Sequence, residues 1–136
     1  NSPNILSSGN FRMLAIANPL LAPYGEAAVE VLQRLACYER LGTKMVKGEN
    51  IAQTFQFVAT GSADLGLVAL SQLRDSGLSD VGSQWSVPTA MHSPIRQDAV
   101  LLTSAAEKPA AVALMRFIQS EQIRQLIVES GYLLAD

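Results

Sequence analysis

The hydrophobic positions of this chain alternate between short apolar runs and longer amphipathic stretches. The apolar runs predict strands at 11–17, 44–47, 64–70, 84–87 and 98–102. The stretches 25–36 and 50–60 carry apolar residues at every third or fourth position, which predicts two amphipathic helices. Further helices are predicted at 71–75, 109–118 and 121–129. The continuous apolar run 64–70 is typical of a strand that is buried on both faces.

Turn and capping residues agree with these boundaries. Asn18-Pro19 ends the first strand, and either Glu49 or Asn50 can cap the helix that follows the second strand. Pro109 suits the first turn of its helix. Strands and helices that alternate in this order predict an α/β fold, in the form of a three-layer α/β/α lobe with a mostly parallel sheet. Residues 1–10 are polar and rich in turn formers, and we interpret them as a lead-in.

Composition narrows the classes of function. The 136 residues suit about one domain, and 49% hydrophobic with 16% charged residues is enough to build a core. The net charge is −2 and the cations are not clustered, which argues against binding of nucleic acid. No run approaches the roughly 18 apolar residues of a membrane span, so no membrane insertion is expected. The first residues lack the basic start and apolar stretch of a leader.

The residue types used in catalysis do not form a recognisable group. Cys37 is the only cysteine, and we interpret it as a small core residue, with a reactive thiol as the alternative. His92 is the only histidine and lies in a loop beside Ser93, without a second metal ligand at a suitable spacing. We therefore expect no enzyme, no metal site and no cofactor.

The strongest functional signal comes from two strand-to-helix connections, 18–25 and 48–53. Each places the first N–H groups of a helix beyond the end of a strand, and such groups attract anions because they lack internal partners. Gly25 would let a ligand approach the backbone, and Tyr24 offers a phenolic donor; Asn50 and Ile51 begin the other helix. The alternative is purely structural: residues 23–25 shape a turn, and residues 49–51 form an ordinary cap.

Longer motifs in the same regions resemble a known family. The series FRMLAIANPLLAPYGEAAVEVL, GENIAQTFQFVATGSADLGLVALSQL, SPIRQDAVLL and a final helix pair ending in ESGY are similar to the periplasmic molybdate-binding proteins of ABC transporters. The resemblance covers nearly the whole chain. It implies a type II periplasmic-binding-protein fold, in which two α/β lobes hold molybdate or tungstate by hydroxyl and backbone N–H groups.

The resemblance also implies a set of binding residues. Ala22 and Tyr24 would lie in the turn that faces the anion, and Asn50 and Ile51 would supply backbone N–H groups. Some relatives have an anion-binding tyrosine after the next strand, where this chain has Ala69. Tyr24 would then take the phenolic role, as in relatives that share the APYG motif.

The resemblance further implies a division of the chain. Residues 11–103 would form the second lobe of a solute-binding protein, and residues 104–136 would form helices that return to a first lobe. The serine-rich anion loop of that first lobe has no counterpart here. We therefore expect weakened binding of molybdate or tungstate, a homodimer or a domain swap, an ABC permease as a further partner, and a periplasmic location if a leader is removed. The alternative function is a detached ligand-sensing or protein-interaction domain with no role in transport.

Overall fold

The computed structural model describes residues 3–78 and 81–134, in two compact units, Asn1–Ile95 and Arg96–Asp136. The division precedes the boundary at 103/104 that the resemblance implies. The first two residues of the expected lead-in and the last two of the C-terminal helical segment lie outside the described residues. Each unit is described by itself.

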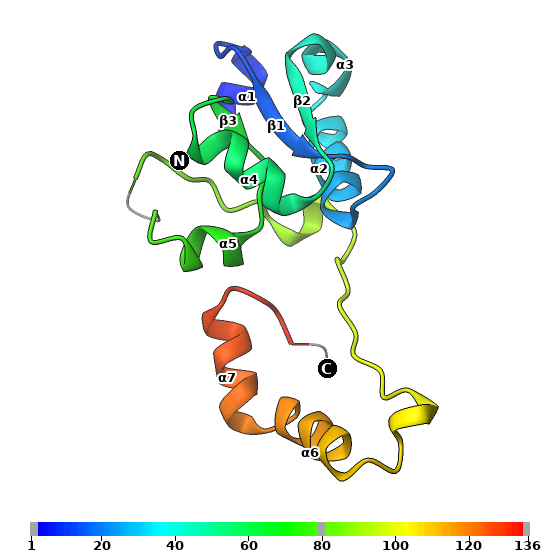
Figure 1. The fold of residues 1–136 in the computed structure, drawn as a ribbon. Coiled ribbons are helices and arrows are strands. Elements are labelled where there is room, and N and C mark those ends of the chain that lie inside the picture. Colours follow the sequence, from blue (N-terminus) through cyan, green and yellow to red (C-terminus); the bar gives the residue numbers. More distant parts are fainter. Residues whose placement is uncertain (1–2, 79–80, 135–136) are drawn as a thin grey trace. The chain divides into compact units, whose positions relative to one another are not determined.

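The first unit is built on a parallel sheet of three strands (Figure 1). These strands are β1 (Leu14–Ala17), β2 (Met45–Gly48) and β3 (Leu65–Gly66), in the spatial order β2-β1-β3. Ala17 at the end of β1 pairs with Gly48 at the end of β2. Strand β1 lies in the middle of the sheet, and all four of its residues are buried. It is therefore the central element of the core.

Helices connect the strands and cover both faces of the sheet (Figure 1). Helix α2 (Pro23–Arg34), α3 (Tyr38–Leu41) and the 3-10 turn η1 (Gly42–Lys44) lie between β1 and β2. Helix α4 (Ile51–Ala59) joins β2 to β3, and α5 (Leu70–Asp75) follows β3. The three-layer arrangement with a parallel sheet is therefore confirmed, as are the helices predicted at 25–36, 50–60 and 71–75. Helix α3 and the turn η1 were not predicted.

The core lies on the face of the sheet that α2 and α3 cover. Its buried members come from β1, from these helices and from the N-terminal segment: Leu6, Leu14, Ile16, Ala28, Leu32, Cys37 and Leu41. Burial raises the pKa of the Cys37 thiol, which donates to the Leu32 carbonyl oxygen at 3.5 Å. The interpretation of this cysteine as a small core residue agrees with both observations.

The interpretation of residues 1–10 as a polar lead-in was wrong. Residues Asn4–Ser8 form a short helix, α1, and Leu6 is only 5% exposed within the core. Two cationic side chains hold this segment: the Arg40 guanidinium donates to the Leu6 carbonyl oxygen at 3.2 Å, and Lys44 donates to those of Gly9 and Phe11 at 2.7 and 2.9 Å. Two adjacent apolar residues, Ile5 and Leu6, in a polar stretch give too weak a periodic signal for a sequence pattern to detect.

Three predicted strands also require correction. The run 64–70 pairs only at Leu65–Gly66, because α5 begins at Leu70. Residues 84–87 and 98–102 form no strand. Val100 and Leu102 are 79% and 63% exposed. An apolar run becomes a strand only where a neighbouring strand accepts its backbone hydrogen bonds, and neither segment has such a neighbour among the described residues.

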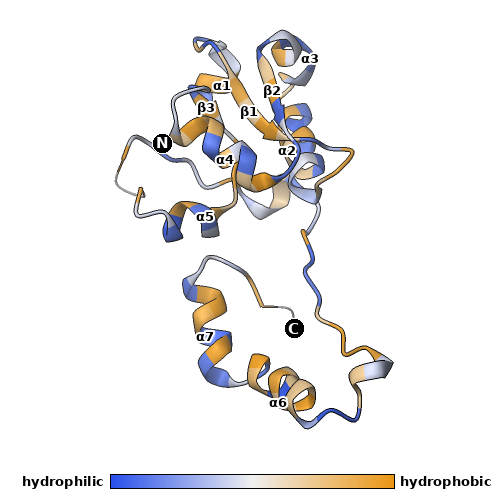
Figure 2. Cartoon of the chain, in the orientation of Figure 1, coloured by the Kyte–Doolittle hydropathy of each residue, from blue (hydrophilic) through white to orange (hydrophobic). Residues whose placement is uncertain are grey.

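The second unit contains the 3-10 turn η3 (Thr103–Ala105) and two helices, α6 (Pro109–Ile118) and α7 (Glu121–Glu129), with the predicted helix bounds. Neither helix has a buried residue. Five of the larger apolar residues in these helices are half-buried: Val112, Met115, Ile118, Ile123 and Ile127. Other apolar residues are exposed: Leu114, Phe117, Leu126, Val128, Tyr132 and Leu133. Figure 2 shows how much of both helices is apolar.

Glycines occur where helices approach the sheet most closely. A Cβ at position 25 would lie 2.6 Å from the carbonyl carbon of Asn18 and from the nitrogen of Pro19. A Cβ at position 48 would lie 2.6 Å from the hydroxyl oxygen of Thr54. These distances are too short for any side chain, so both positions need glycine for packing alone.

We expect Gly25→Ala to lower the free energy of unfolding by about 1–3 kcal/mol, because the added methyl group would push α2 away from the end of β1. Gly42→Ala is the matched control. Position 42 has a φ of −49° and no atom within 4 Å of its Cβ. Alanine there should leave stability unchanged or raise it by about 0.4–1 kcal/mol. Urea denaturation followed by circular dichroism measures both changes, and equal midpoints for the two variants would contradict the packing argument.

Candidate functional site

The start of α2 is built by a tight turn after β1. The Asn18 carbonyl oxygen accepts hydrogen bonds from the N–H groups of Leu21 and Ala22, both at 3.0 Å. Ala22 is the extended N-cap residue, with φ −140° and ψ 128°, and Pro23 occupies the first turn. The Ala22 carbonyl oxygen in turn accepts from the Gly25 N–H at 2.8 Å. This turn leaves Tyr24 half-buried at the beginning of the helix.

The start of α4 has a side-chain cap. Asn50 is the N-cap, and its Oδ1 accepts from the Gln53 N–H at 2.9 Å. The Gln53 Oε1 reaches back to accept from the Glu49 N–H at 2.7 Å. Of the two capping residues that the sequence allowed, the structure therefore selects Asn50. The reciprocal pair fixes the first turn of α4 in the manner of a capping box.

The two helix starts lie at one edge of the sheet. Ala17 and Gly48 are paired at the carboxyl ends of β1 and β2, and the Asn18 N–H donates to the Gly48 carbonyl oxygen at 2.7 Å. Helix α5 begins beyond β3, at the same edge. In open α/β sheets this edge is where ligands bind, since the positive ends of several helices gather there. The structure thus brings the connections 18–25 and 48–53 together, as the sequence predicted.

The five candidate residues differ in what they can still offer a ligand. The N–H groups of Ala22 and Gly25 already donate within the α2 turn. The Gly25 Cα faces the backbone at residues 17–19, so its contacts explain the glycine without a ligand. Among the described residues, the structure gives the N–H groups of Asn50 and Ile51 no protein acceptor. The backbone N–H groups without a protein acceptor are therefore concentrated at the start of α4.

The loop with His92 is fastened to α2 in the first unit. The 3-10 turn η2 (Thr89–Met91) precedes it, the Ser93 N–H donates to the Glu30 carboxylate at 2.6 Å, and His92 Nδ1 lies 2.8 Å from the Ser93 carbonyl oxygen. Within 3–78 and 81–134, no three His, Cys, Asp or Glu side chains are grouped so that they could hold a metal ion. None of the helices in these ranges has the length and apolar character needed to cross a membrane.

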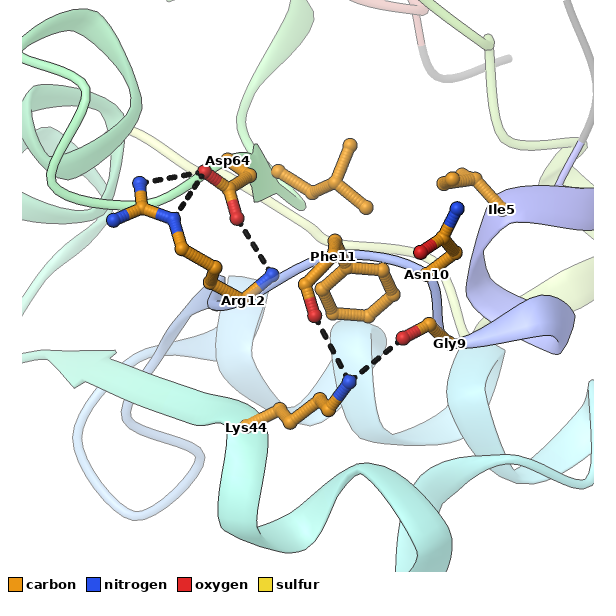
Figure 3. A pocket seen from close by; sticks show the side chains of 8 residues that line it. Ile5, Gly9, Asn10, Phe11, Arg12, Lys44 and Asp64 are labelled. Carbon is orange, nitrogen blue, oxygen red and sulfur yellow. Dashed lines mark hydrogen bonds and ion pairs between the residues drawn. The ribbon is translucent and has the colours of Figure 1, made fainter.

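A hollow of about 480 Å³ lies at the opposite end of the strands (Figure 3). Its lining includes Arg12, Lys44 and Asp64, which precede β1, β2 and β3 respectively. The Lys44 ammonium group lies 5.4 Å from the centre of the Phe11 ring and bonds two backbone carbonyl oxygens. These charged groups are engaged in holding the chain together at the amino ends of the strands.

Arg12 and Asp64 form the ion pair at this end of the sheet. The Asp64 carboxylate lies 2.7 Å from Arg12 Nη2 and also accepts from the Arg12 N–H at 2.6 Å and the Met13 N–H at 3.3 Å. The hydrogen bonds from Arg12 hold the pKa of the Asp64 carboxyl below its ordinary value, and Asp64 raises the pKa of the guanidinium. The pair joins residues far apart in the sequence, so no local motif predicts it.

Residues 1–133 match the family of bacterial extracellular solute-binding proteins. The chain belongs to that family. This solute-binding protein is 48% identical, over 94% of its length, to the molybdate-binding protein ModA of Azotobacter vinelandii. It is 45% identical, over 88% of its length, to the protein of the same name from Rhodobacter capsulatus. The resemblance found in the sequence is thereby confirmed.

Solved structures give the same family and fold. The periplasmic molybdate-binding protein of Azotobacter vinelandii superposes with a TM-score of 0.87 at 34% identity, covering 97% of this chain and 58% of that one. A substrate-binding domain of a molybdenum transporter from Clostridium difficile, at 23% identity and a TM-score of 0.73, shares the fold. The chain spans about half the length of the curated relatives it matches, 51% and 46%.

We expect the contribution of Asp64 to stability to depend on pH. Because the pKa of Asp64 is lowered on folding, its stabilisation is present above the unfolded pKa of about 3.9 and is lost as the pH falls through the folded value. Asp64→Asn should therefore be less stable than the wild type at pH 7, by an amount that shrinks towards pH 2. Thermal unfolding at a series of pH values measures this difference. Asp98→Asn, at an exposed position in the second unit, is the control, and a difference that stays constant with pH would refute the linkage.

Proposed function

We propose that this chain supplies one side of a binding site for a tetrahedral oxyanion, molybdate or tungstate, in the solute-binding component of an ABC transporter. One observation supports this most directly. The starts of α2 and α4 follow two paired strands and are joined by the bond between the Asn18 N–H and the Gly48 carbonyl oxygen. The names of the relatives from Azotobacter vinelandii and Rhodobacter capsulatus support molybdate as the ligand.

The proposed roles rest on the open backbone N–H groups at the start of α4 and on the phenol that Tyr24 places at the start of α2. The N–H groups of Asn50 and Ile51, at the positive end of α4, donate to the anion. The Tyr24 phenol donates to it from the start of α2. Ala22 and Gly25 shape the α2 turn, since their N–H groups are already engaged. Neutral donors suit an oxyanion that must later be released, because they bind it without forming an ion pair. No acid–base chemistry is involved in this proposal, and the protein acts as a carrier and not as an enzyme.

One side of a site binds an anion weakly. A hydrogen bond to a charged group contributes about 1.5–3 kcal/mol, and each 1.4 kcal/mol changes the dissociation constant by about tenfold. If two or three donors come from elsewhere, their absence weakens binding by several orders of magnitude. We propose that a partner copy or chain outside these 136 residues provides them. The working location is the periplasm, where the bound anion is delivered to an ABC permease.

A second candidate function is a detached ligand-sensing or protein-interaction domain with no role in transport. The observation that favours it is the apolar exposure of the second unit, where Phe117 and Leu126 are 51% and 54% exposed. Such a surface promotes association with another chain. Under this proposal the lobe still resembles its relatives in fold, but residues 96–136 serve to bind another protein.

Calorimetric or NMR titration of the 136-residue chain with molybdate, tungstate and sulfate tests the oxyanion proposal. We expect weak binding that Tyr24→Phe reduces by about ten- to a hundredfold, since one charge-assisted hydrogen bond is lost. Tyr38→Phe is the matched control. Tyr38 lies in α3 and its ring packs on the core, so loss of its hydroxyl should leave anion binding unchanged. Tight molybdate-selective binding by a proven monomer would contradict the one-sided site. Failure of all three anions to bind at millimolar concentration would favour the second candidate.

We also expect a homodimer or a domain swap at high protein concentration. Association would bury the exposed apolar residues of α6 and α7, and removing apolar surface from water is favourable. Light scattering across a concentration series measures the mass. Phe117→Ser and Leu126→Ser should shift the distribution towards the monomer, whereas Arg116→Ser, on the same helix as Phe117, should have little effect. A monomer mass at every concentration would rule out self-association.

A further inference from the structure

Gln72 links the start of α5 to the start of α4. It lies in the first turn of α5, which follows β3 with Ala69 as its N-cap. With the carboxamide oriented to satisfy both of its groups, Nε2 donates to the Ile51 carbonyl oxygen at 3.2 Å and Oε1 accepts from the Ala52 N–H at 3.3 Å. One neutral side chain therefore bonds two consecutive residues at the proposed anion-binding end of α4.

Nearly every other polar backbone group in this turn is also engaged. Gln53 Oε1 accepts from the Glu49 N–H, and Asn50 Oδ1 accepts from the Gln53 N–H. The Asn50 carbonyl oxygen accepts from the N–H and the hydroxyl of Thr54, at 3.1 and 2.9 Å. Gln72 takes the Ala52 N–H. The donors left over among the described residues are the N–H groups of Asn50 and Ile51, the two adjacent positions that the proposed function uses.

We infer that Gln72 is a positioning residue, which determines which N–H groups of α4 meet the oxyanion and fixes their direction. The inference rests on the proposed function. A helix start with several open donors accepts an anion in several poses. Here the carboxamide occupies the Ala52 donor and, through the Ile51 carbonyl oxygen, holds the peptide between Ile51 and Ala52. The Ile51 N–H belongs to the preceding peptide, whose Asn50 carbonyl oxygen is held by Thr54, and it remains an open donor next to the fixed unit. The anion then meets two donors in one fixed geometry.

The chemistry of the position favours glutamine over its near relatives. Only a neutral carboxamide both donates to the Ile51 carbonyl oxygen and accepts from the Ala52 N–H. A glutamate could accept but not donate, and its negative charge would lie beside the bound anion and repel it. A methionine has a similar length but makes neither hydrogen bond. These two substitutions therefore separate the loss of positioning from the addition of charge.

NMR of the ¹⁵N-labelled 136-residue chain tests the inference, with sodium molybdate and sodium sulfate as probes. In the wild type, molybdate should shift the amide signals of Asn50 and Ile51 and leave that of Ala52 nearly unmoved. In Gln72→Met, the Ala52 amide should exchange with solvent faster and should join the residues that molybdate shifts, with binding about fivefold weaker. Gln72→Glu should bind more weakly still. Gln56→Met, at an exposed position of α4, is the matched control and should behave as the wild type.

The outcomes separate this inference from the proposed function. If molybdate shifts the same amides with the same affinity in the wild type and in Gln72→Met, the positioning role is overturned while the oxyanion site stands. If molybdate shifts no amide of the wild type at millimolar concentration, the proposed function fails, and the role of Gln72 towards the anion fails with it. Unchanged exchange of the Ala52 amide in Gln72→Met would overturn the contact itself.

Discussion

The approach of α2 to the end of β1 is the constraint on which the rest of the first unit depends. The helix lies against the backbone at residues 17–19, and only a residue without a side chain fits at position 25. The same condition holds at Gly48, where α4 approaches the end of β2. Because glycine removes the side-chain layer at both points, the two helices begin directly beyond the paired strand ends. The parallel strands bring the helix N-termini to one edge, and the two glycines allow α2 and α4 to approach the strand ends closely.

The two ends of the sheet use different kinds of polar interaction. At the amino ends, charged groups hold the chain: Lys44 bonds the carbonyl oxygens of Gly9 and Phe11, and Arg12 pairs with Asp64 (Figure 3). At the carboxyl ends, the contacts that shape the turns are neutral, through Asn18, Asn50, Gln53 and Gln72. For the oxyanion site proposed above, a neutral framework would leave the helix N-terminal N–H groups as the source of attraction.

The second unit poses a different physical problem. Its helices have the predicted bounds, yet neither contains a buried residue. Two short helices cannot enclose a core of their own, because each has only one face that the other can cover. Apolar residues such as Phe117 and Leu126 therefore remain in water in the unit as described. The chain spans about half the length of the curated relatives it matches.

The sequence by itself determined the features that arise from local periodicity and local chemistry. The longer helices α2, α4, α6 and α7, the approximate places of the three paired strands, and the cap at Asn50 or Glu49 could be predicted, because each depends on residues within a few positions. The short helices α1 and α3 could not. The motifs at 18–25 and 48–53 also identified the family. The tertiary structure decided what depends on distant neighbours: that Leu6 joins the core, that residues 98–102 find no strand partner, that Arg12 meets Asp64, and that Gln72 reaches α4. The residues in such contacts are not separated by any regular spacing along the chain. The contacts form only when the fold brings distant segments together.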